Sequence, residues 1–253
     1  SLYTNNLKET DKIVMWQYKG IYVLDNDSES SVMNLSFDKY ENKLGTLVDK
    51  YYIMPDYTNS SVLEFSSITV VDLSNMKQFK IYLDYTLSSN TYVNGVIDNK
   101  LYYTDPSNLL QVEVNPKNKN SRLIGSNDIG GQNYINGNWE NANIYDFTTN
   151  EIKFTNIPDF SYSYREIVDG KSSYYYYTSD GDIYQLIKGH LDNPILIYKA
   201  SNLNNFRAVG SDIYYVVDNT LYYFNIVNGS VPILISNDLI YNTANRISVY
   251  RNK

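Results

Sequence analysis

The sequence predicts an all-β chain in which one short antiparallel unit recurs about six times. Runs with the helical spacing i, i+3, i+4, i+7 are scarce, whereas short β-branched and aromatic runs bounded by Asn, Asp, Gly and Ser are dense. A local motif also recurs, in which a small or polar residue precedes an Ile/Leu-Tyr-Tyr variant and an Asp follows within a few residues. These Asp residues run from Asp25 to Asp218, so the five intervals between them average roughly 39 residues.

The motif is expected to form the second strand of each unit. Its instances are residues 20–25, 50–56, 100–105, 143–146, 174–180 and 213–218. Because an aspartate carboxylate can accept hydrogen bonds from backbone N–H groups two residues on, each Asp is expected to begin a reverse turn. Ser179-Asp180-Gly181 and Asp218-Asn219 also suit tight hairpins, which require positive φ angles.

Three further strands are predicted around each motif. A leading strand precedes it at 13–16, 92–97, 133–136, 166–168 and 206–209. A third strand follows the turn at 108–114, 151–154, 182–186 and 221–224, and a fourth follows at 77–83, 121–124, 194–198 and 232–235. Residues 59–65 and 136–141 fit the pattern least well and are interpreted as an insertion and a loop.

A four-stranded meander with this period predicts one β-propeller domain over residues 1–253, with six four-stranded blades preferred and seven or five left open. Two packed sheets would also contain many short strands, but they give no reason for the period. The C-terminal residues 245–253 resemble residues 11–19. They either complete the first blade, which would remove exposed strand edges, or begin a seventh.

Composition excludes several classes of function. The 253 residues include 28 Tyr, one His and no Cys, so cysteine zinc sites, disulfides and cysteine nucleophiles are excluded and only His190 could serve a triad. The net charge is −7 without basic runs, which argues against nucleic-acid binding. No run approaches the ~18 apolar residues of a spanning helix, so no membrane insertion is expected.

One unit carries a family resemblance. Leu101-Tyr102-Tyr103-Thr104-Asp105, with Leu110 and Val112 downstream, resembles the YWTD-type repeat of six-bladed propellers with Tyr in place of Trp. It is also similar to Tyr-rich repeats of bacterial cell-surface propellers from low-GC Gram-positive organisms. Residues 177–180 match more loosely. The resemblance implies a rigid, non-catalytic recognition disc, often extracellular and attached to other modules, and it transfers no catalytic residue.

Two groups of residues are candidates for ligand binding on the channel face. Arg165, Arg207 and Arg246 precede leading-strand residues at spacings of 42 and 39, so they could form a shared cationic patch for carboxylate or phosphate. The alternative is that each pairs with a nearby acid such as Glu166 or Asp169. The aromatic candidates, which could stack on sugar rings or peptide side chains, are Tyr92, Tyr134 and Trp139. Trp16, in an apolar run, is interpreted as a core residue.

Catalysis and metal binding are the weaker interpretations. Asp98, Glu140, Glu166 and Asp169 lie near positions that could supply a glycosidase pair, but carboxylates are common in an acidic chain. Residues 25–29 begin like a Ca²⁺ loop, yet Ser30 and Ser36 stand where the loop needs Gly and Glu, so a hairpin turn is expected. His190 is interpreted as a surface residue. We therefore expect no catalytic residue, metal or cofactor.

The sequence thus predicts a non-catalytic binding or scaffolding module, secreted or at a bacterial cell surface, that recognises a protein or carbohydrate ligand. It is consistent with a segment of a larger multidomain chain. Two alternatives stay open: a carbohydrate-active enzyme, either glycosidase or lyase, on the same fold, and a structural component of a protein assembly.

Overall fold

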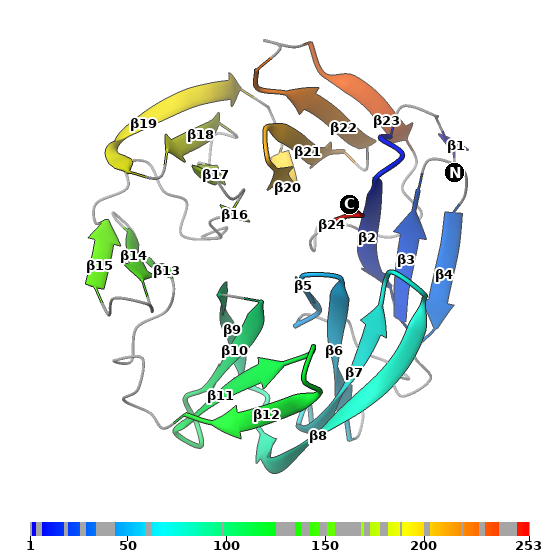
Figure 1. Cartoon of the computed structure of the whole chain (residues 1–253), viewed down its shortest axis with the longest axis vertical. Coiled ribbons are helices and arrows are strands. Elements are labelled where there is room, and N and C mark those ends of the chain that lie inside the picture. The colour runs from blue at the N-terminus through cyan, green and yellow to red at the C-terminus, as the bar shows by residue number, and fades with distance from the viewer. Residues whose placement is uncertain are drawn as a thin grey trace. The chain divides into compact units, whose positions relative to one another are not determined.

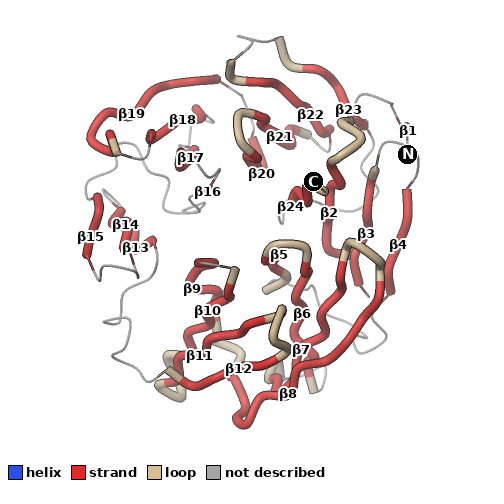
Figure 2. Tube along the Cα trace, viewed as in Figure 1, coloured by secondary structure: helices blue, strands red, loops and turns tan. Residues whose placement is uncertain are grey.

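The computed structural model describes residues 2–3, 7–17, 20–25, 29–33, 44–58, 62–97, 99–124, 135–137, 142–146, 151–154, 168–169, 173–177, 182–187, 189–199, 203–218, 220–227, 231–237 and 247–252. These residues form 24 strands joined by loops and include no helix (Figure 2). No segment in this part of the chain is therefore a helix able to cross a membrane. The chain divides into two compact units. The first unit consists of residues 1–15, 24–29 and 135–251, and the second unit consists of residues 16–23, 30–134 and 252–253.

The second unit contains two four-stranded meanders, in which strands that are adjacent in sequence pair antiparallel (Figure 1). The first consists of β5 (Thr46–Val48), β6 (Tyr51–Tyr57), β7 (Phe65–Asp72) and β8 (Lys77–Leu87). The second consists of β9 (Tyr92–Ile97), β10 (Lys100–Asp105), β11 (Leu110–Asn115) and β12 (Asn120–Leu123). The second meander confirms the predicted order of four strands around Leu101. Strand β7 was not predicted, and Phe65, assigned to an insertion, is its first residue.

The hydrophobic core of this unit lies between the two sheets. Alternate side chains of β10 and β11 point into it, because successive residues of a strand face opposite sides. The buried residues that pack together there include Ile53, Phe65, Ile68, Val70, Ile81, Leu101, Tyr103, Val112 and Val114. The rings of Phe65 and Tyr103 meet edge to face at 5.6 Å. At about 1.5–3 kcal/mol for each large apolar side chain removed from water, this core is a major source of stability.

The first unit contains three successive sheets of the same kind. The first is β13 (Ile135–Gly137), β14 (Ala142–Asp146) and β15 (Glu151–Phe154); the second is β16 (Val168–Asp169), β17 (Ser173–Tyr177), β18 (Asp182–Ile187) and β19 (His190–Lys199); and the third is β20 (Leu203–Val209), β21 (Asp212–Val217), β22 (Thr220–Asn225) and β23 (Ile233–Asn237). Residues 136–137, expected in a loop, end strand β13, whereas 138–141 lie outside the described residues. Between the second and third sheets lie the buried side chains of Tyr175, Ile183, Phe206, Ile213, Tyr215 and Phe224.

The chain ends join sheets at opposite ends of the sequence. The N-terminal strand β1 (Leu2–Tyr3) pairs with β23 as a fifth strand of its sheet, which was not predicted. The C-terminal strand β24 (Ile247–Arg251) pairs antiparallel with β2 (Asp11–Gln17), in the order β24, β2, β3 (Gly20–Leu24), β4 (Glu29–Met33). Of the two interpretations of residues 245–253, the structure therefore supports a strand of the first sheet. The register places Arg251 opposite Asp11.

Three hairpin turns share a local sequence pattern, in which Asp or Asn comes first and Asn fourth, and each ends in a residue with a strained backbone. They are Asp72-Leu73-Ser74-Asn75-Met76, Asp105-Pro106-Ser107-Asn108-Leu109 and Asn115-Pro116-Lys117-Asn118-Lys119. The side chain of the first residue accepts a hydrogen bond from a backbone N–H inside the turn, as from Ser107 N to Asp105 Oδ1 at 3.1 Å. The last residue has a positive φ, 60° in Met76, 55° in Leu109 and 56° in Lys119. The predicted turn role is thus confirmed at Asp105, and Asp218 has the expected positive φ of 49°.

At Asp56 the turn prediction is wrong. Asp56 lies within β6, and its carboxylate accepts hydrogen bonds from Ser67 Oγ at 2.9 Å and Thr69 Oγ1 at 2.6 Å on β7. Lys80 Nζ on β8 lies 3.3 Å from the same carboxylate. Asp56 does not begin a turn because β6 continues to Tyr57. Its side chain instead forms hydrogen bonds with residues of the neighbouring strand.

Replacing Leu109 by glycine should stabilise the protein. A positive φ destabilises the folded state of an L-residue by about 1–2 kcal/mol. Glycine avoids this strain, but it loses more backbone entropy on folding, which costs about 0.5–1 kcal/mol. Leu109 is 74% exposed, so little packing is lost. We expect Leu109→Gly to raise the free energy of unfolding by about 0.5–1 kcal/mol in urea titrations. Lys117→Gly, at an exposed position with negative φ, is the control and should destabilise. Equal destabilisation by both would contradict this account.

Candidate functional site

Two of the six predicted ligand-binding residues lie in the described part of the chain. Tyr92 begins β9, is 38% exposed and stands opposite Thr104 of β10. Arg207 is half-buried in β20, opposite Tyr214, and its Nη1 donates a hydrogen bond to the carbonyl of Phe206 at 2.7 Å. The other four are Tyr134, Trp139, Arg165 and Arg246, which lie outside the described residues. A shared arginine patch therefore stays a prediction.

The candidates for catalysis and metal binding are less fully described. Asp98, Glu140 and Glu166 lie outside the described residues, and Asp169 belongs to β16 without a described side chain, as Trp16 does in β2. His190 begins β19 and is exposed, in agreement with a surface residue. Within the ranges that the structure describes, no three His, Cys, Asp or Glu side chains gather where they could hold a metal ion.

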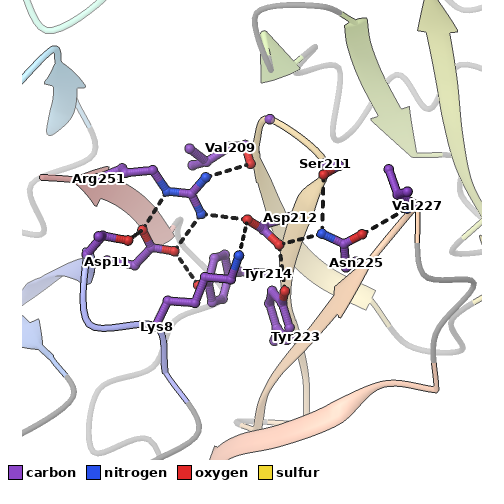
Figure 3. A network of polar contacts seen from close by, with 12 residues as sticks. Lys8, Asp11, Val209, Ser211, Asp212, Tyr214, Tyr223, Asn225, Val227 and Arg251 are labelled. Atoms are coloured by element: carbon purple, nitrogen blue, oxygen red, sulfur yellow. Dashed lines mark hydrogen bonds and ion pairs between the residues drawn. The ribbon is translucent and has the colours of Figure 1, made fainter. Parts of the chain in front are cut away.

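The structure reveals a network of buried charges in the first unit that the sequence analysis missed (Figure 3). Arg251 lies at its centre. Its Nε and Nη2 donate to the two carboxylate oxygens of Asp11 at 2.7 and 2.8 Å, and Nη2 also donates to Asp212 Oδ2 at 2.7 Å. Its Nη1 lies 3.4 Å from the carbonyl oxygen of Val209. One guanidinium thus joins β24 to the start of β2 and to β21.

Both carboxylates are almost fully buried, and each has further donors. Asp11 is 0% exposed and accepts a hydrogen bond from the hydroxyl of Tyr214. Asp212 is 3% exposed and accepts hydrogen bonds from Lys8 Nζ at 2.9 Å, Asn225 Nδ2 at 2.8 Å and the hydroxyl of Tyr223. A buried charge is tolerated only when it is paired and hydrogen-bonded, and this network meets that condition on every side.

Local sequence brings these side chains together. The turn before β2 places Lys8 beside Asp11, whose backbone N–H donates to the Lys8 carbonyl at 2.9 Å. Asp212 follows the turn at Gly210, where φ is +60° and a Cβ would approach Arg251 Nη1 to 3.9 Å. Asn225 ends β22 directly opposite Asp212. The similarity of residues 11–19 to 245–253 could have indicated the Asp11–Arg251 pair, because antiparallel pairing of these two segments places Asp11 opposite Arg251. No local sequence pattern indicates Asp212.

The network keeps Asp212 ionised and Tyr214 and Tyr223 neutral. Burial raises the pKa of Asp212, but the hydrogen bonds from Tyr223, Asn225, Lys8 and Arg251 outweigh it and lower the pKa to about 2. Burial and the hydrogen bond to Asp212 raise the pKa of Tyr223 to about 12. The hydrogen bonds to Asp11 raise the pKa of Arg251. Such groups do not exchange protons near neutral pH, so the network is suited to positioning the chain ends and unsuited to acid–base catalysis.

Comparison with solved structures identifies the fold. No family model matches the sequence, and no curated protein matches it. One similar chain comes from the nidogen/laminin complex, with a TM-score of 0.56, 12% identity and coverage of 96% of this chain and 99% of that one. Another is the tricorn protease, with a TM-score of 0.63, 14% identity and coverage of 91% of this chain but only 26% of that one. Both matches are β-propellers, so the all-β chain has a β-propeller fold; identities this low show the fold alone.

Removing the central guanidinium should be strongly destabilising. Arg251→Gln would leave two buried carboxylates without their shared cation, which costs about 3–5 kcal/mol in the free energy of unfolding. Arg251→Lys should fall in between, because an ammonium cannot supply the forked geometry. The comparison variant is Arg122→Gln, whose side chain is 66% exposed and serves a single carboxylate, Glu113, so it should cost less than Arg251→Gln. If denaturant titrations gave equal losses of unfolding free energy for Arg251→Gln and Arg122→Gln, the central role of Arg251 in the network would be refuted.

Acid should remove the stability that Asp212 contributes. The pKa of Asp212 is lowered from 3.8 to about 2 in the folded protein. Its contribution to stability is therefore complete at pH values above its pKa in the unfolded chain, and it is lost as the pH falls from about 4 to about 2. We expect a loss of roughly 1–2 kcal/mol, reduced by solvent screening at half-exposed Lys8. In urea midpoints measured across this range, Asp212→Asn should flatten the decline and the exposed turn variant Asp218→Asn should not. Parallel curves for all three proteins would show that another group titrates.

Proposed function

We propose that this chain is a six-bladed β-propeller of the YWTD-like, Tyr-rich type that acts as a non-catalytic recognition module outside a bacterial cell. Six sheets are described, and four of them have four strands. One sheet gains β1 as a fifth strand, and the three-stranded sheet β13–β15 precedes residues 155–167, which lie outside the described residues. This count supports six blades, and the unit at residues 101–105 supports the family type.

The observation that supports a non-catalytic role is the direction in which the pKa values of the carboxylates are shifted. A glycosidase needs a carboxylic acid whose pKa is raised. The carboxylates with shifted pKa values in the described part of the chain are Asp72, Asp105, Glu113 and Asp212, and every shift is a lowering. Burial raises each pKa, but hydrogen bonds outweigh it, assisted by a cation at all but Asp105. These groups serve structure.

The similar structures are compatible with a recognition function. The nidogen/laminin structure is a complex of two proteins, and this chain matches 99% of the aligned chain. The tricorn protease is an enzyme, but this chain corresponds to 26% of it, so its proteolytic activity is not transferred. A binding module with a protein or carbohydrate ligand therefore agrees with both comparisons. The acidic net charge of −7 disfavours nucleic acid as the ligand.

A binding assay that also monitors turnover tests this function. The purified chain would be applied to an array of bacterial and host glycans and to immobilised extracellular matrix proteins, and the glycans would be analysed by mass spectrometry after prolonged incubation. We expect saturable binding to at least one surface and unchanged glycan masses. Cleaved glycans would favour the carbohydrate-active enzyme instead. Failure to bind any array member or matrix protein would count against recognition of either ligand class.

A further inference from the structure

The outer strands of the sheets differ in how their edges are protected. A strand at the edge of a sheet presents backbone N–H and C=O groups with which a further strand can pair. Proteins commonly protect such an edge with charged side chains or with a covering segment. The outer strands whose side chains the structure describes are β8, β12, β19 and β23.

Three of these four outer strands have one of these protections. Lys77, Lys80 and Asp84 are exposed on β8. The side chain of Arg122 on β12 is 66% exposed. Strand β23 pairs with the N-terminal strand β1, which occupies the place of an incoming strand. An incoming strand would have to desolvate the charges on β8 and β12, or displace β1 from β23.

Strand β19 has neither protection over residues 195–198. The run Ile195-Leu196-Ile197-Tyr198 contains no charge, and Ile195 and Leu196 are 37% and 42% exposed. β19 is the last strand of its sheet and pairs with β18, and no other described strand pairs with it (Figure 1). Pro194 and an irregular register interrupt the strand before this run, so the open part of the edge is residues 195–199.

The corresponding strand of the next sheet shows what this edge accepts. Tyr184 stands opposite Leu196, and 38 residues further along the chain Tyr222 stands opposite Leu234. Both outer strands contain Pro-Ile-Leu-Ile, at residues 194–197 and 232–235. On β23, β1 pairs antiparallel with residues 236–237, which correspond to residues 198–199 of β19. The repeat therefore accommodates a fifth strand at the position that is open on β19.

An added strand at β19 would also meet apolar side chains. Ile195 stands opposite Gln185, whose Nε2 lies 3.5 Å from the hydroxyl of Tyr175. Tyr175 belongs to the apolar cluster between the second and third sheets of the first unit, and Ile197 and Tyr198 pack against the same cluster. Ile195 thus extends this cluster to the surface, where apolar side chains of an added strand can pack against it.

The charge at the end of the open edge selects among strands. Lys199 is exposed, and no carboxylate in the part of the chain that the structure describes forms an ion pair with it. In the register of β1 on β23, the residue of an added strand that corresponds to Leu2 would face Lys199. An acidic side chain there would be attracted and a basic one repelled. A second copy of this chain carries the same net charge of −7, which opposes pairing between copies.

From these observations we infer that residues 195–199 of β19 bind an extended segment of a partner protein, which pairs antiparallel as a fifth strand of the sheet β16–β19. The segment carries apolar side chains and places an acidic residue opposite Lys199. Main-chain hydrogen bonds provide affinity, and these side chains provide specificity. The inference rests on the proposed recognition function and narrows its ligand to a protein that offers an unpaired strand.

The test titrates the whole chain into the fluorescently labelled peptide Ser-Glu-Tyr-Val-Thr-Val-Thr, followed by anisotropy. We expect saturable binding, and binding about fivefold weaker or more when Lys replaces Glu in the peptide. Lys199→Glu should reverse this preference. Because only alternate N–H groups of the peptide point toward β19, N-methylation of one alternate set should abolish binding and N-methylation of the other set should not.

A charge placed on the open edge provides the second arm of the test. Leu196→Lys should weaken the Kd for the glutamate peptide by about tenfold or more. The matched control is Leu123→Lys, since Leu123 is 50% exposed on the outer strand β12; it should bind as the wild type does. Lys199→Glu, at an exposed position, keeps the test decisive if Leu196→Lys does not fold.

Four results would overturn the inference. They are absence of peptide binding at millimolar concentrations, equal binding of the two N-methylated peptides, unchanged binding in both Leu196→Lys and Lys199→Glu, and a dimer in sedimentation that Leu196→Lys abolishes, which would assign the edge to a second copy. In each case, saturable binding of the wild type to a glycan or a matrix protein would leave the recognition function standing. Absence of that binding as well would count against the recognition function itself.

Discussion

The ion pairs of Arg251 are the constraint on which the arrangement of the chain ends depends. They join residues 240 positions apart in the Asp11–Arg251 pair and 39 apart in the Asp212–Arg251 pair. Loop-closure entropy grows only logarithmically with length, so a long-range pair costs little more than a short one once the intervening sheets have formed. The larger cost is desolvation of three charged groups, which is offset only if the geometry is good at every bond. The planar fork of arginine meets this requirement, because it serves two carboxylates and a backbone carbonyl at once.

The abundance of tyrosine follows from the two kinds of surface that each sheet must provide. In strands β21 and β22, the rings of Tyr215 and Tyr222 stack at 5.3 Å on the side that faces the apolar cluster of the first unit. On the opposite side, Tyr214 and Tyr223 lie 5.2 Å apart and donate their hydroxyls to the buried carboxylates. Tyrosine fills a core like phenylalanine and also supplies a donor at its edge. A repeat rich in this residue can therefore build apolar packing and a buried charge network without changing its strand pattern.

Local patterns in the sequence predicted what is set locally. Alternation and turn residues located the strands of the meander β9–β12, and the Asp105 turn followed from the hydrogen-bonding capacity of aspartate. Strand β7 was missed because the residues before it, 59–65, were interpreted as an insertion, although residues 68–71 are all β-branched. The Asp56 error arose because identical residues act differently inside a strand and at its end. The Arg251 network could not be predicted as a whole, since Asp212 meets its partners only through tertiary packing. The pairing of Thr104 with Tyr92 and Gln111 could not be predicted either, because these residues become neighbours only when the register of three strands is set.

The same alternation allows one face of a sheet to change its side chains without changing the fold. On β21 and β22 the positions of Val216 and Leu221 are filled by apolar side chains, and the polar groups beside them are satisfied by Lys8, Asp11 and Arg251 from the chain ends. On β10 and β11, the corresponding Thr104 and Gln111 present polar atoms that no described residue satisfies. Only alternate side chains differ, so the apolar face that packs into the core is untouched. The apolar face is thus kept in both sheets, whereas the opposite face carries a charge network in one sheet and other polar side chains in the other, which is why fold resemblance alone does not identify what such a module binds.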